Sequence, residues 1–528
     1  MRDSLIRGPW RLLLAPTALM LIGSPAATQN VLETWDPAPY WEVDWLPDLD
    51  ADGFPELLVG NGGWPDNSAF RGRVYVVSGR GKQVLWETRG TTDSDVFGAH
   101  VLTVGDMNGD GFPDVAAAAR SSLGLHILDG TDGSILYVSP HSPHSIAAMG
   151  DVDGDKLADV LLSSPFPHIL LGGRFEILPW DTTGFWGTSC ARIGDVDEDG
   201  MADFVVGNWV AWPQPGPYFQ PGAAWVYSTR DGSVIRFHSG TFDFARFGRD
   251  VAGPGDLNGD GVSDYAISEP ESRLGNVTGD LHLFDGPTGE LISIVPGDFP
   301  NYAYWSEEIA VGDDVDGNGF NDLLVSAHAA QVHFLEGKSR ETVYVLEGGT
   351  PFQIVDDWNG DGFPDLLIWP PKPSPFVNSP LTLFSGAPEG ITVHGRACAP
   401  PGRELPRIGA TGAARIGHDF PVNLSRVEPG GHAFLLLGPL GSTPYVPPPA
   451  SARCWIGVEN PVLRSVRIEE IRPGEGAATV TVPIPNVFST IGMSFAMQWV
   501  VLSPGKVRVP TAVTRVLEVV LQRRNLYE

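Results

Sequence analysis

Seven short segments of this chain carry oxygen-bearing side chains at alternating positions. Each segment follows the pattern D-x-[DN]-x-[DN]-G-x-x-[DE], except that Lys156 replaces the glycine in the third, and a short apolar run comes next. The side chains at positions 1, 3, 5 and 9 are Asp48, Asp50, Asp52 and Glu56; Asp106, Asn108, Asp110 and Asp114; Asp151, Asp153, Asp155 and Asp159; Asp195, Asp197, Asp199 and Asp203; Asp256, Asn258, Asp260 and Asp264; Asp314, Asp316, Asn318 and Asp322; and Asp357, Asn359, Asp361 and Asp365.

This spacing is typical of a Ca²⁺-binding loop. Calcium takes six to eight oxygen ligands at about 2.3–2.6 Å, and side chains at positions 1, 3 and 5 converge on one ion when the chain turns sharply. Glycine at position 6 tolerates the positive φ of such a turn, and the acid at position 9 closes the cage. An EF-hand places its last glutamate at position 12 between helices, whereas β-like residues such as Leu57-Leu58-Val59 follow these segments. We therefore expect up to seven Ca²⁺ ions, in loops that join two strands.

The alternative is that the segments are metal-free turns, because Asp and Asn stabilise turns without a cation. The seven segments hold 24 carboxylates, however, and three or four of them in one loop repel one another strongly unless a cation is bound. The third loop is expected to be the weakest site, because Lys156 strains its turn and adds a positive charge.

The segments begin 43 to 61 residues apart, and each lies within sequence that predicts four strands. In the first repeat the predicted strands are Tyr40 to Leu46, Glu56 to Val59, Arg73 to Ser78 and Gln83 to Thr88. Four antiparallel strands repeated around an axis form a β-propeller. The predicted fold class is therefore all-β, with a seven-bladed β-propeller over residues 31–395 and a small β-sandwich domain over residues 396–528.

The repeats resemble the FG-GAP repeats of integrin α-chain propellers over about two thirds of the chain. Three sequence elements carry the resemblance. They are the "FG" pairs Phe97-Gly98 and Phe247-Gly248, the Gly-Asp pairs Gly105-Asp106 and Gly255-Asp256 at the loop entry, and Gly60-Asn61 and Gly207-Asn208 where the "GAP" element begins. The "FG" element is absent or altered in the first, third, sixth and seventh repeats. The resemblance implies Ca²⁺ at positions 1, 3, 5 and 9, a backbone carbonyl ligand at position 7, and a role in adhesion, without fixing the ligand.

From about Arg396 the metal-loop pattern stops, and the remaining third reads as a β-domain with proline-rich joints. It is similar to the C-terminal β-domains of secreted bacterial FG-GAP proteins. Its predicted strands are Val422 to Leu437, Ala452 to Val458, Val466 to Ile471, Ala478 to Ile484 and Met493 to Leu502. Cys398 and Cys454 form a candidate disulfide, which would leave Cys190 as a free thiol.

The N-terminus predicts export. Arginines precede an apolar stretch from Leu12 to Gly23, and small residues follow, so residues 1–27 read as a signal peptide cleaved near Ala26 or Ala27; an uncleaved anchor is the alternative. No membrane insertion is expected after cleavage, and the protein is predicted to be secreted or at the cell surface. A net charge of −30 argues against nucleic-acid binding, which needs a basic surface.

Aromatic residues concentrate in loops expected on the face opposite the metal loops. The candidate ligand-binding residues are Trp64, Trp209, Trp212, Tyr218 and Trp305. Such a face favours an extracellular protein or glycan ligand, although the rings could instead pack the loops together. The predicted function is thus a calcium-binding adhesion module and not an enzyme, since no H-E-x-x-H, G-x-S-x-G or phosphate-binding glycine loop is present. The alternative is a secreted propeller hydrolase or lyase acting on polysaccharide.

Overall fold

The computed structural model consists of β-strands joined by turns and loops. The part of the chain that it describes contains no helix, and so no helix long and apolar enough to cross a membrane. The described residues are 31–35, 42–62, 65–66, 69–91, 96–119, 124–139, 141–163, 166–178, 187–210, 221–240, 244–271, 279–297, 305–312, 314–315, 318–327, 331–347, 349–355, 358, 364–369, 381–384, 391–394, 407–410, 419–427, 432–438, 440–445, 456–458, 462–467, 469–472, 475–483, 494–502, 512–513 and 516–520.

Six antiparallel sheets follow one another along the chain, and a predicted metal loop joins the first two strands of each. Their strands are β2 (Glu42–Leu46), β3 (Glu56–Asn61), β6 (Arg73–Val77) and β7 (Val84–Arg89); β8 (His100–Gly105), β9 (Asp114–Ala118), β10 (Leu125–Leu128) and β11 (Ile135–Ser139); β12 (Ile146–Gly150), β13 (Asp159–Leu162) and β14 (His168–Leu170); β15 (Ser189–Arg192), β16 (Phe204–Asn208), β17 (Ala223–Tyr227) and β18 (Val234–Ser239); β19 (Val251–Gly255), β20 (Asp264–Glu269), β21 (Asp280–Phe284) and β22 (Leu291–Pro296); and β23 (Ile309–Val311), β24 (Leu323–Ala327), β25 (Gln331–Leu335) and β26 (Thr342–Glu347). A two-stranded hairpin, β4 (Pro65–Asp66) and β5 (Ala69–Phe70), lies between β3 and β6.

The seventh sheet combines one strand from the start of the chain with three strands that follow the sixth sheet. It consists of β27 (Gly349–Val355), β28 (Asp365–Trp369), β29 (Leu381–Phe384) and the N-terminal strand β1 (Val31–Trp35). Strand β1 pairs antiparallel with β29, with Trp35 opposite Leu381, so the start of the chain provides the outer strand of this sheet.

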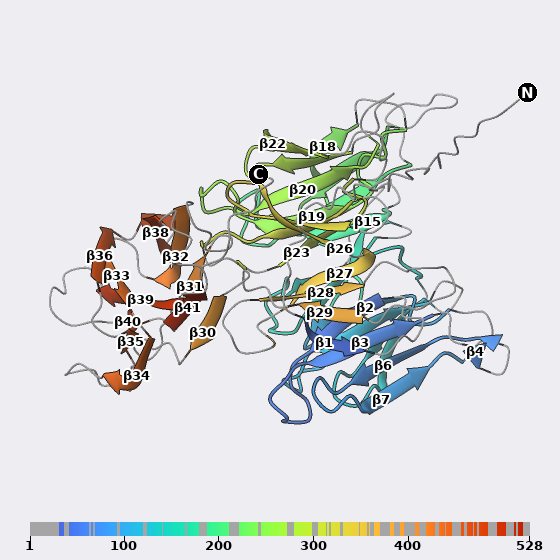
Figure 1. Ribbon diagram of the computed structural model, residues 1–528. Helices are drawn as coiled ribbons and strands as arrows, with labels where there is room; N and C mark the ends of the chain where they lie inside the picture. Colours follow the sequence, from blue (N-terminus) through green and yellow to red (C-terminus); the bar gives the residue numbers. More distant parts are fainter. Residues whose placement is uncertain are drawn as a thin grey trace, which may run out of the picture.

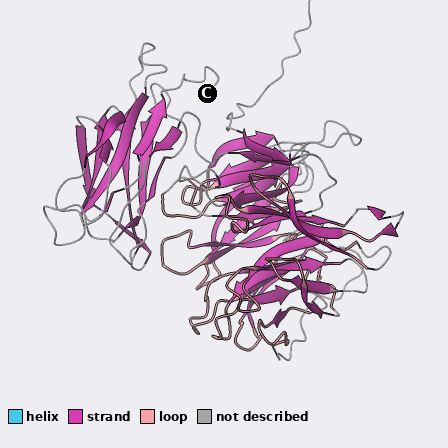
Figure 2. Cartoon of the chain, turned by 90° about the horizontal axis from the view of Figure 1, so that it is seen from below, coloured by secondary structure: helices cyan, strands magenta, loops and turns pink. Residues whose placement is uncertain are grey.

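The seven sheets form a closed circle through their first strands. Strand β2 contacts β8, and the contacts continue through β12, β15, β19, β23 and β27 back to β2. Figures 1 and 2 show the sheets gathered in one body with the C-terminal strands as a separate group beside it. The predicted all-β propeller fold is therefore confirmed.

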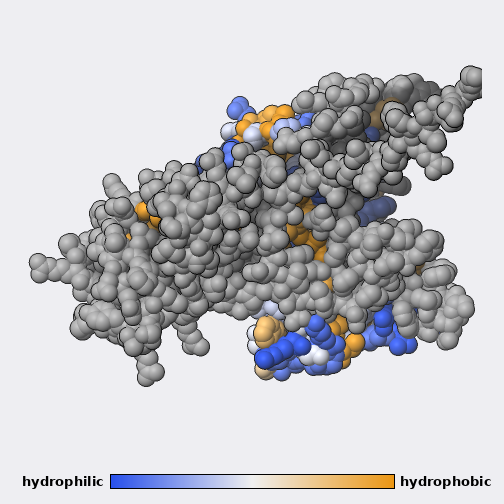
Figure 3. Space-filling view, viewed as in Figure 1, coloured by the Kyte–Doolittle hydropathy of each residue, from blue (hydrophilic) through white to orange (hydrophobic). Residues whose placement is uncertain are grey.

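The core lies between neighbouring sheets. One cluster joins Leu58 and Val76 of the first sheet to Val101 and Val115 of the second, and all four are nearly inaccessible to solvent. The inner strands are buried on both faces, which explains their continuous apolar sequences. The fourth strands, such as β18 and β22, alternate between exposed and half-buried residues. On the coloured surface in Figure 3, hydrophobic patches lie beside hydrophilic ones.

The "FG" pairs join one sheet to the next. Phe97 is buried and bridges Gly72 of the preceding repeat, and Phe247 bridges Gly222 in the same way. Gly98 has a φ of +78°, and a Cβ atom there would lie 2.5 Å from the carbonyl oxygen of Arg73. Glycine is therefore required by both backbone conformation and close packing.

The C-terminal strands form two larger sheets and a small one. The larger sheets contain β30 (Ile391–His394), β41 (Val516–Val520), β39 (Ser494–Leu502), β40 (Ala512–Val513), β33 (His432–Gly438) and β36 (Val462–Arg467); and β31 (Arg407–Ala410), β32 (Asp419–Val427), β38 (Glu475–Pro483) and β37 (Glu469–Arg472). The small sheet pairs β34 (Leu440–Tyr445) with β35 (Ile456–Val458).

Three expectations for this region need correction. The strand predicted from Val422 to Leu437 is two strands, β32 and β33, because the turn-forming sequence Pro429-Gly430-Gly431 separates them. The strand predicted from Val466 to Ile471 likewise divides between β36 and β37, which belong to different sheets. Strand β30 precedes the predicted boundary at residue 395 yet pairs with β41, so it belongs to the C-terminal sheets.

Candidate metal-binding loops and the opposite face

Each described metal loop is shaped by hydrogen bonds from its own backbone to its acidic side chains. In the loop between β8 and β9, the N–H of Gly111 donates to Oδ2 of Asp106 at 2.8 Å, and the N–H of Phe112 donates to Oδ1 of Asp110 at 2.8 Å. The same two bonds, from positions 6 and 7 to positions 1 and 5, recur in the first to sixth loops. The side chains at positions 1 and 5 therefore accept hydrogen bonds from one turn in each of these loops.

In three loops the carboxylate oxygens lie close enough to share one cation. Within each group, one ligand atom per residue lies within 4.8 Å of the others. The groups are Asp48, Asp50 and Glu56; Asp151, Asp153 and Asp159; and Asp195, Asp197 and Asp199. Because every donor is an oxygen, these loops fit a hard cation such as Ca²⁺ better than a metal that favours nitrogen or sulfur.

The acid at position 9 has a structural role that sequence reasoning missed. Asp114, Asp264 and their equivalents are fully buried. In the first six loops each of these acids accepts at least two backbone hydrogen bonds. For Asp264, the N–H of Leu257 donates to Oδ2 at 2.7 Å and the N–H of Gly286 donates to Oδ1 at 3.0 Å. One bond comes from the loop and the other from the turn after the third strand, so this carboxylate ties the loop to its sheet.

Burial also changes the acidity of these carboxyl groups. Desolvation raises the pKa of Asp114 and of Asp159 to about 6 and that of Asp203 and of Asp264 to about 7. Nearby loop carboxylates raise the pKa further, while the two backbone hydrogen bonds lower it.

The turn after the third strand adds a side chain to several loops. The amide of Asn108 donates to Asp129 at 3.2 Å, and that of Asn258 donates to Asp285 at 2.6 Å. In the first loop the hydroxyl of Ser78 donates to Asp52 at 3.1 Å. The acid of the repeated sequences Leu128-Asp129-Gly130 and Phe284-Asp285-Gly286 thus reaches the loop.

In two loops an acid is contacted by an arginine from outside the loop. Arg174 contacts Asp153 and lies 4.0 Å from Asp155 in the third loop. Arg230 contacts Asp199 at 2.8 Å in the fourth. The third loop has a further departure, because Lys156 has a φ of +73°, where the glycines at position 6 have φ of +92° to +95°. A residue with a Cβ atom therefore occupies the left-handed position of this turn.

Some predicted site residues lie outside the described part of the chain. These are Asp316, Asp357, Asn359, Asp361, Trp64, Trp212, Tyr218, Cys398 and Cys454. In the last loop, Asp365 accepts the N–H of Trp358 at 2.9 Å, as at position 9 elsewhere. Cys190 is a buried free thiol.

The two described candidates for the ligand face differ. Trp209 follows β16 at the end away from the metal loop; it is half-buried, and the guanidinium of Arg246 lies 5.2 Å from its ring. Trp305 is 4% exposed and packs in the core between β21 and β24, with its ring edge-on to His333. The expectation that Trp305 faces a ligand is therefore wrong, because neighbouring sheets cover its ring.

Comparisons with known proteins agree with this geometry. Residues 48–117 and 106–162 match the model of the FG-GAP-like repeat. Integrin alpha-PS5 of Drosophila melanogaster is 32% identical over 152 residues, which cover 27% of this chain and 15% of that protein. Integrin alpha-5 of Xenopus laevis is 29% identical over 206 residues, which cover 34% of this chain and 19% of that protein. The chain thus spans less than a fifth of the length of these relatives, and the resemblance of its repeats to integrin α-chains is confirmed.

Proposed function

We propose that this chain, which carries FG-GAP-like repeats in a propeller, is an extracellular binding protein stabilised by Ca²⁺. The observation that carries the proposal is the recurrence of one oxygen-lined loop at the same place in successive sheets, between the first and second strands. A repeated ion site on one face leaves the opposite face free to vary and to bind a ligand.

In this proposal, the side chains at positions 1, 3, 5 and 9 hold the ion, and the buried acid at position 9 also fixes the loop to its sheet. Asp106 and Asp110 would hold it in the second loop, and Asp256 and Asp260 in the fifth. A bound Ca²⁺ supplies the positive charge that brings these carboxylates together, so the loops act as structural ties of the ring.

The proposed binding face lies around Trp209. Strand β16 runs from the metal-loop end to Asn208, so Trp209 lies at the opposite end of its sheet. Arg246 approaches the Trp209 ring and pairs with Glu271 at 3.0 Å, which places an aromatic ring and both charges at one rim. Aromatic and arginine side chains of this kind are typical anchors for a protein ligand, and an indole can also stack on a sugar.

The proposal is tested by binding the mature protein to protein and glycan arrays, with Ca²⁺ and with excess chelator. Trp209→Ala combined with Trp212→Ala should abolish binding and leave the melting temperature in Ca²⁺ unchanged. Phe112→Ala is the matched control, because Phe112 is an exposed aromatic residue on the metal-loop face.

Two results would contradict the proposed function. One is binding that persists in the variant that lacks both Trp209 and Trp212. The other is turnover of a polysaccharide by the mature protein, measured as new reducing ends or unsaturated products, which would identify an enzyme instead.

The proposed location and domain division have their own tests. Mass spectrometry of the exported protein should find an N-terminus near residue 27 or 28, and an intact Met1 would contradict cleavage. Limited proteolysis should cut between β29 and β30 and release the C-terminal sheets, which we propose to form a sandwich domain.

A further inference from the structure

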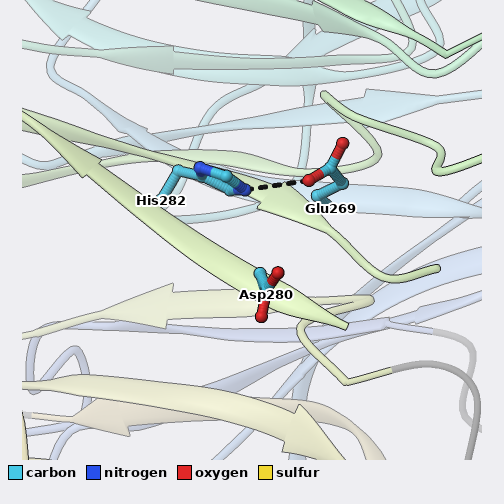
Figure 4. Close-up of side chains that lie close together, drawn as sticks. All are labelled: Glu269, Asp280 and His282. Carbon is cyan, nitrogen blue, oxygen red and sulfur yellow. Dashed lines mark hydrogen bonds and ion pairs between the residues drawn. The ribbon is translucent and has the colours of Figure 1, made fainter. Parts of the chain in front are cut away.

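A buried group of two carboxylates and one imidazole lies in the fifth sheet, away from the metal loops. Glu269 ends β20 and Asp280 begins β21, and the two residues face each other across the strands. His282 is opposite Ile267 in the same pair, so its imidazole lies on the same side of the sheet as the two acids. Figure 4 shows the Glu269 carboxylate against the His282 imidazole, with Asp280 on the same strand as His282.

The distances within this group are short. Nε2 of His282 and Oε2 of Glu269 are 3.0 Å apart. One ligand atom from each of the three residues lies within 4.8 Å of the others. Two ligands of a tetrahedral zinc site, each about 2.0–2.2 Å from the metal, lie about 3.3 Å apart. Small side-chain rotations would therefore bring all three atoms to one ion.

Both carboxylates of this group are removed from solvent. Glu269 is 3% exposed and Asp280 is 5% exposed. Like charges directly opposite each other in a sheet are unfavourable. Oε1 of Glu269 is buried and accepts no hydrogen bond from the described residues. A divalent cation would neutralise both acids.

The carboxylates are not a feature of the repeat. At the position of the Glu269–Asp280 pair, other sheets have Asn61 opposite Arg73, Asn208 opposite Ala223 and Ala327 opposite Gln331. The histidine does recur for packing: His126 is edge-on to Phe97 at 4.9 Å, as His282 is to Phe247 at 5.4 Å. Among the described sheets, only the fifth therefore adds two acids to this imidazole.

We propose that Glu269, Asp280 and His282 bind one Zn²⁺ ion, at a site separate from the calcium loops. One imidazole nitrogen with two carboxylates suits zinc, whereas calcium requires six to eight oxygen ligands. The site lies five residues along β20 from Asp264 of the fifth loop, roughly 17 Å away. The proposed zinc site therefore lies at the end of the fifth sheet away from the metal loop. Trp209 lies at the corresponding end of the fourth sheet.

The test is titration of the full chain with ZnCl₂ in excess CaCl₂, so that the acidic loops are already saturated, with uptake followed by calorimetry. Binding of Co²⁺ in place of zinc gives a visible absorption band that reports imidazole and carboxylate ligation. The wild type should bind one equivalent of zinc. Glu269→Gln and His282→Gln should each weaken zinc binding by at least roughly 10- to 100-fold. Loss of a residue that only hydrogen-bonds to a metal ligand already has an effect of this size.

The matched control is His126→Gln, which removes the equivalent imidazole from a sheet without the two acids and should leave zinc binding unchanged. Melting curves in Ca²⁺ show whether each variant is folded. A wild-type chain that takes up no zinc in excess Ca²⁺ overturns the proposal, whatever the variants do. Equal zinc binding by wild type and His282→Gln, or uptake of Mn²⁺ without zinc, overturns it as well.

Discussion

The buried carboxylate of Asp264 accepts the backbone N–H of Gly286 at 3.0 Å, and so joins the metal loop to the turn beyond the third strand. Its other oxygen accepts the N–H of Leu257. The acid at position 9 is thus part of the hydrogen bonding of the sheet, in addition to any contact with an ion.

This relationship predicts that Asp264→Ala destabilises the protein whether or not Ca²⁺ is present. Two buried N–H groups would lose their acceptor, at a cost of about 3 kcal/mol or more. Asp260 is an exposed loop residue, so Asp260→Ala should be costly only in Ca²⁺. Urea unfolding of both variants with Ca²⁺ and with chelator measures the difference. An Asp264→Ala chain as stable as wild type in chelator would contradict it.

The third loop should be improved by Lys156→Gly. The left-handed conformation costs a residue with a Cβ atom about 1–2 kcal/mol, and glycine avoids part of this cost. The substitution also removes a positive charge from the loop. Stability in Ca²⁺ should rise by about 1 kcal/mol. Lys82→Gly is the control, since Lys82 has a φ of +56° in a turn outside the loops and its replacement should not alter the response to Ca²⁺.

The same loop should contribute least to the stability that Ca²⁺ provides. Arg174 already contacts Asp153 and lies near Asp155, so a bound cation would meet an existing positive charge. Asp155→Ala should therefore lower the melting temperature in Ca²⁺ less than Asp110→Ala or Asp260→Ala. An equal or larger decrease for Asp155→Ala would show that the arginine does not weaken the site.

Stability at acid pH should depend on Asp44. This side chain accepts the N–H of Thr103 from the next sheet at 2.6 Å, and desolvation by burial raises its pKa from 3.8 to about 6. The folded chain then binds more protons than the unfolded chain between these values, so this group makes stability fall as pH rises through the window. The effect is at most about 3 kcal/mol.

Asp44→Asn should therefore reduce the dependence of unfolding free energy on pH between about 4 and 6 in saturating Ca²⁺. Asp132→Asn is the control, because hydrogen bonds from Ser134 lower the pKa of this exposed acid and place its titration below that window. An unchanged pH profile for Asp44→Asn would mean that Asp44 stays ionised.

Thiol counting tests the cysteines. Cys190 is buried, and desolvation raises its pKa to about 12, so the native unreduced protein should react slowly with a thiol reagent at neutral pH. After denaturation one reactive thiol should appear if Cys398 and Cys454 form the predicted disulfide. That disulfide would raise the free energy of unfolding by roughly 4 kcal/mol in the chain-entropy model. Three thiols would rule out the bridge.

The sequence was most informative where conformation is local. The spacing of Asp106, Asp110 and Gly111 specifies a turn by itself, and the apolar runs after each loop specify the second strands. The structure contains both. The pairing of β1 with β29 was not predicted, because a partner some 350 residues away leaves no local signal in Val31–Trp35.

Burial was harder to predict than conformation. Trp305 lies in an aromatic loop sequence that looks exposed, but packing between two sheets covers it. The acids after the third strands, such as Asp285, were likewise missed as loop partners because only the sheet brings them to Asn258.

The most direct test is a melting curve of the intact protein in Ca²⁺ and in excess EGTA, with Mg²⁺ added to keep the ionic strength. If Ca²⁺ holds the loops together, each site filled at a hundredfold excess over its Kd contributes about 2.7 kcal/mol. Removal of the ions should therefore lower the melting temperature by more than about 10 °C or unfold the ring. A melting curve that excess chelator leaves unchanged would show that the acidic segments are turns and not calcium sites.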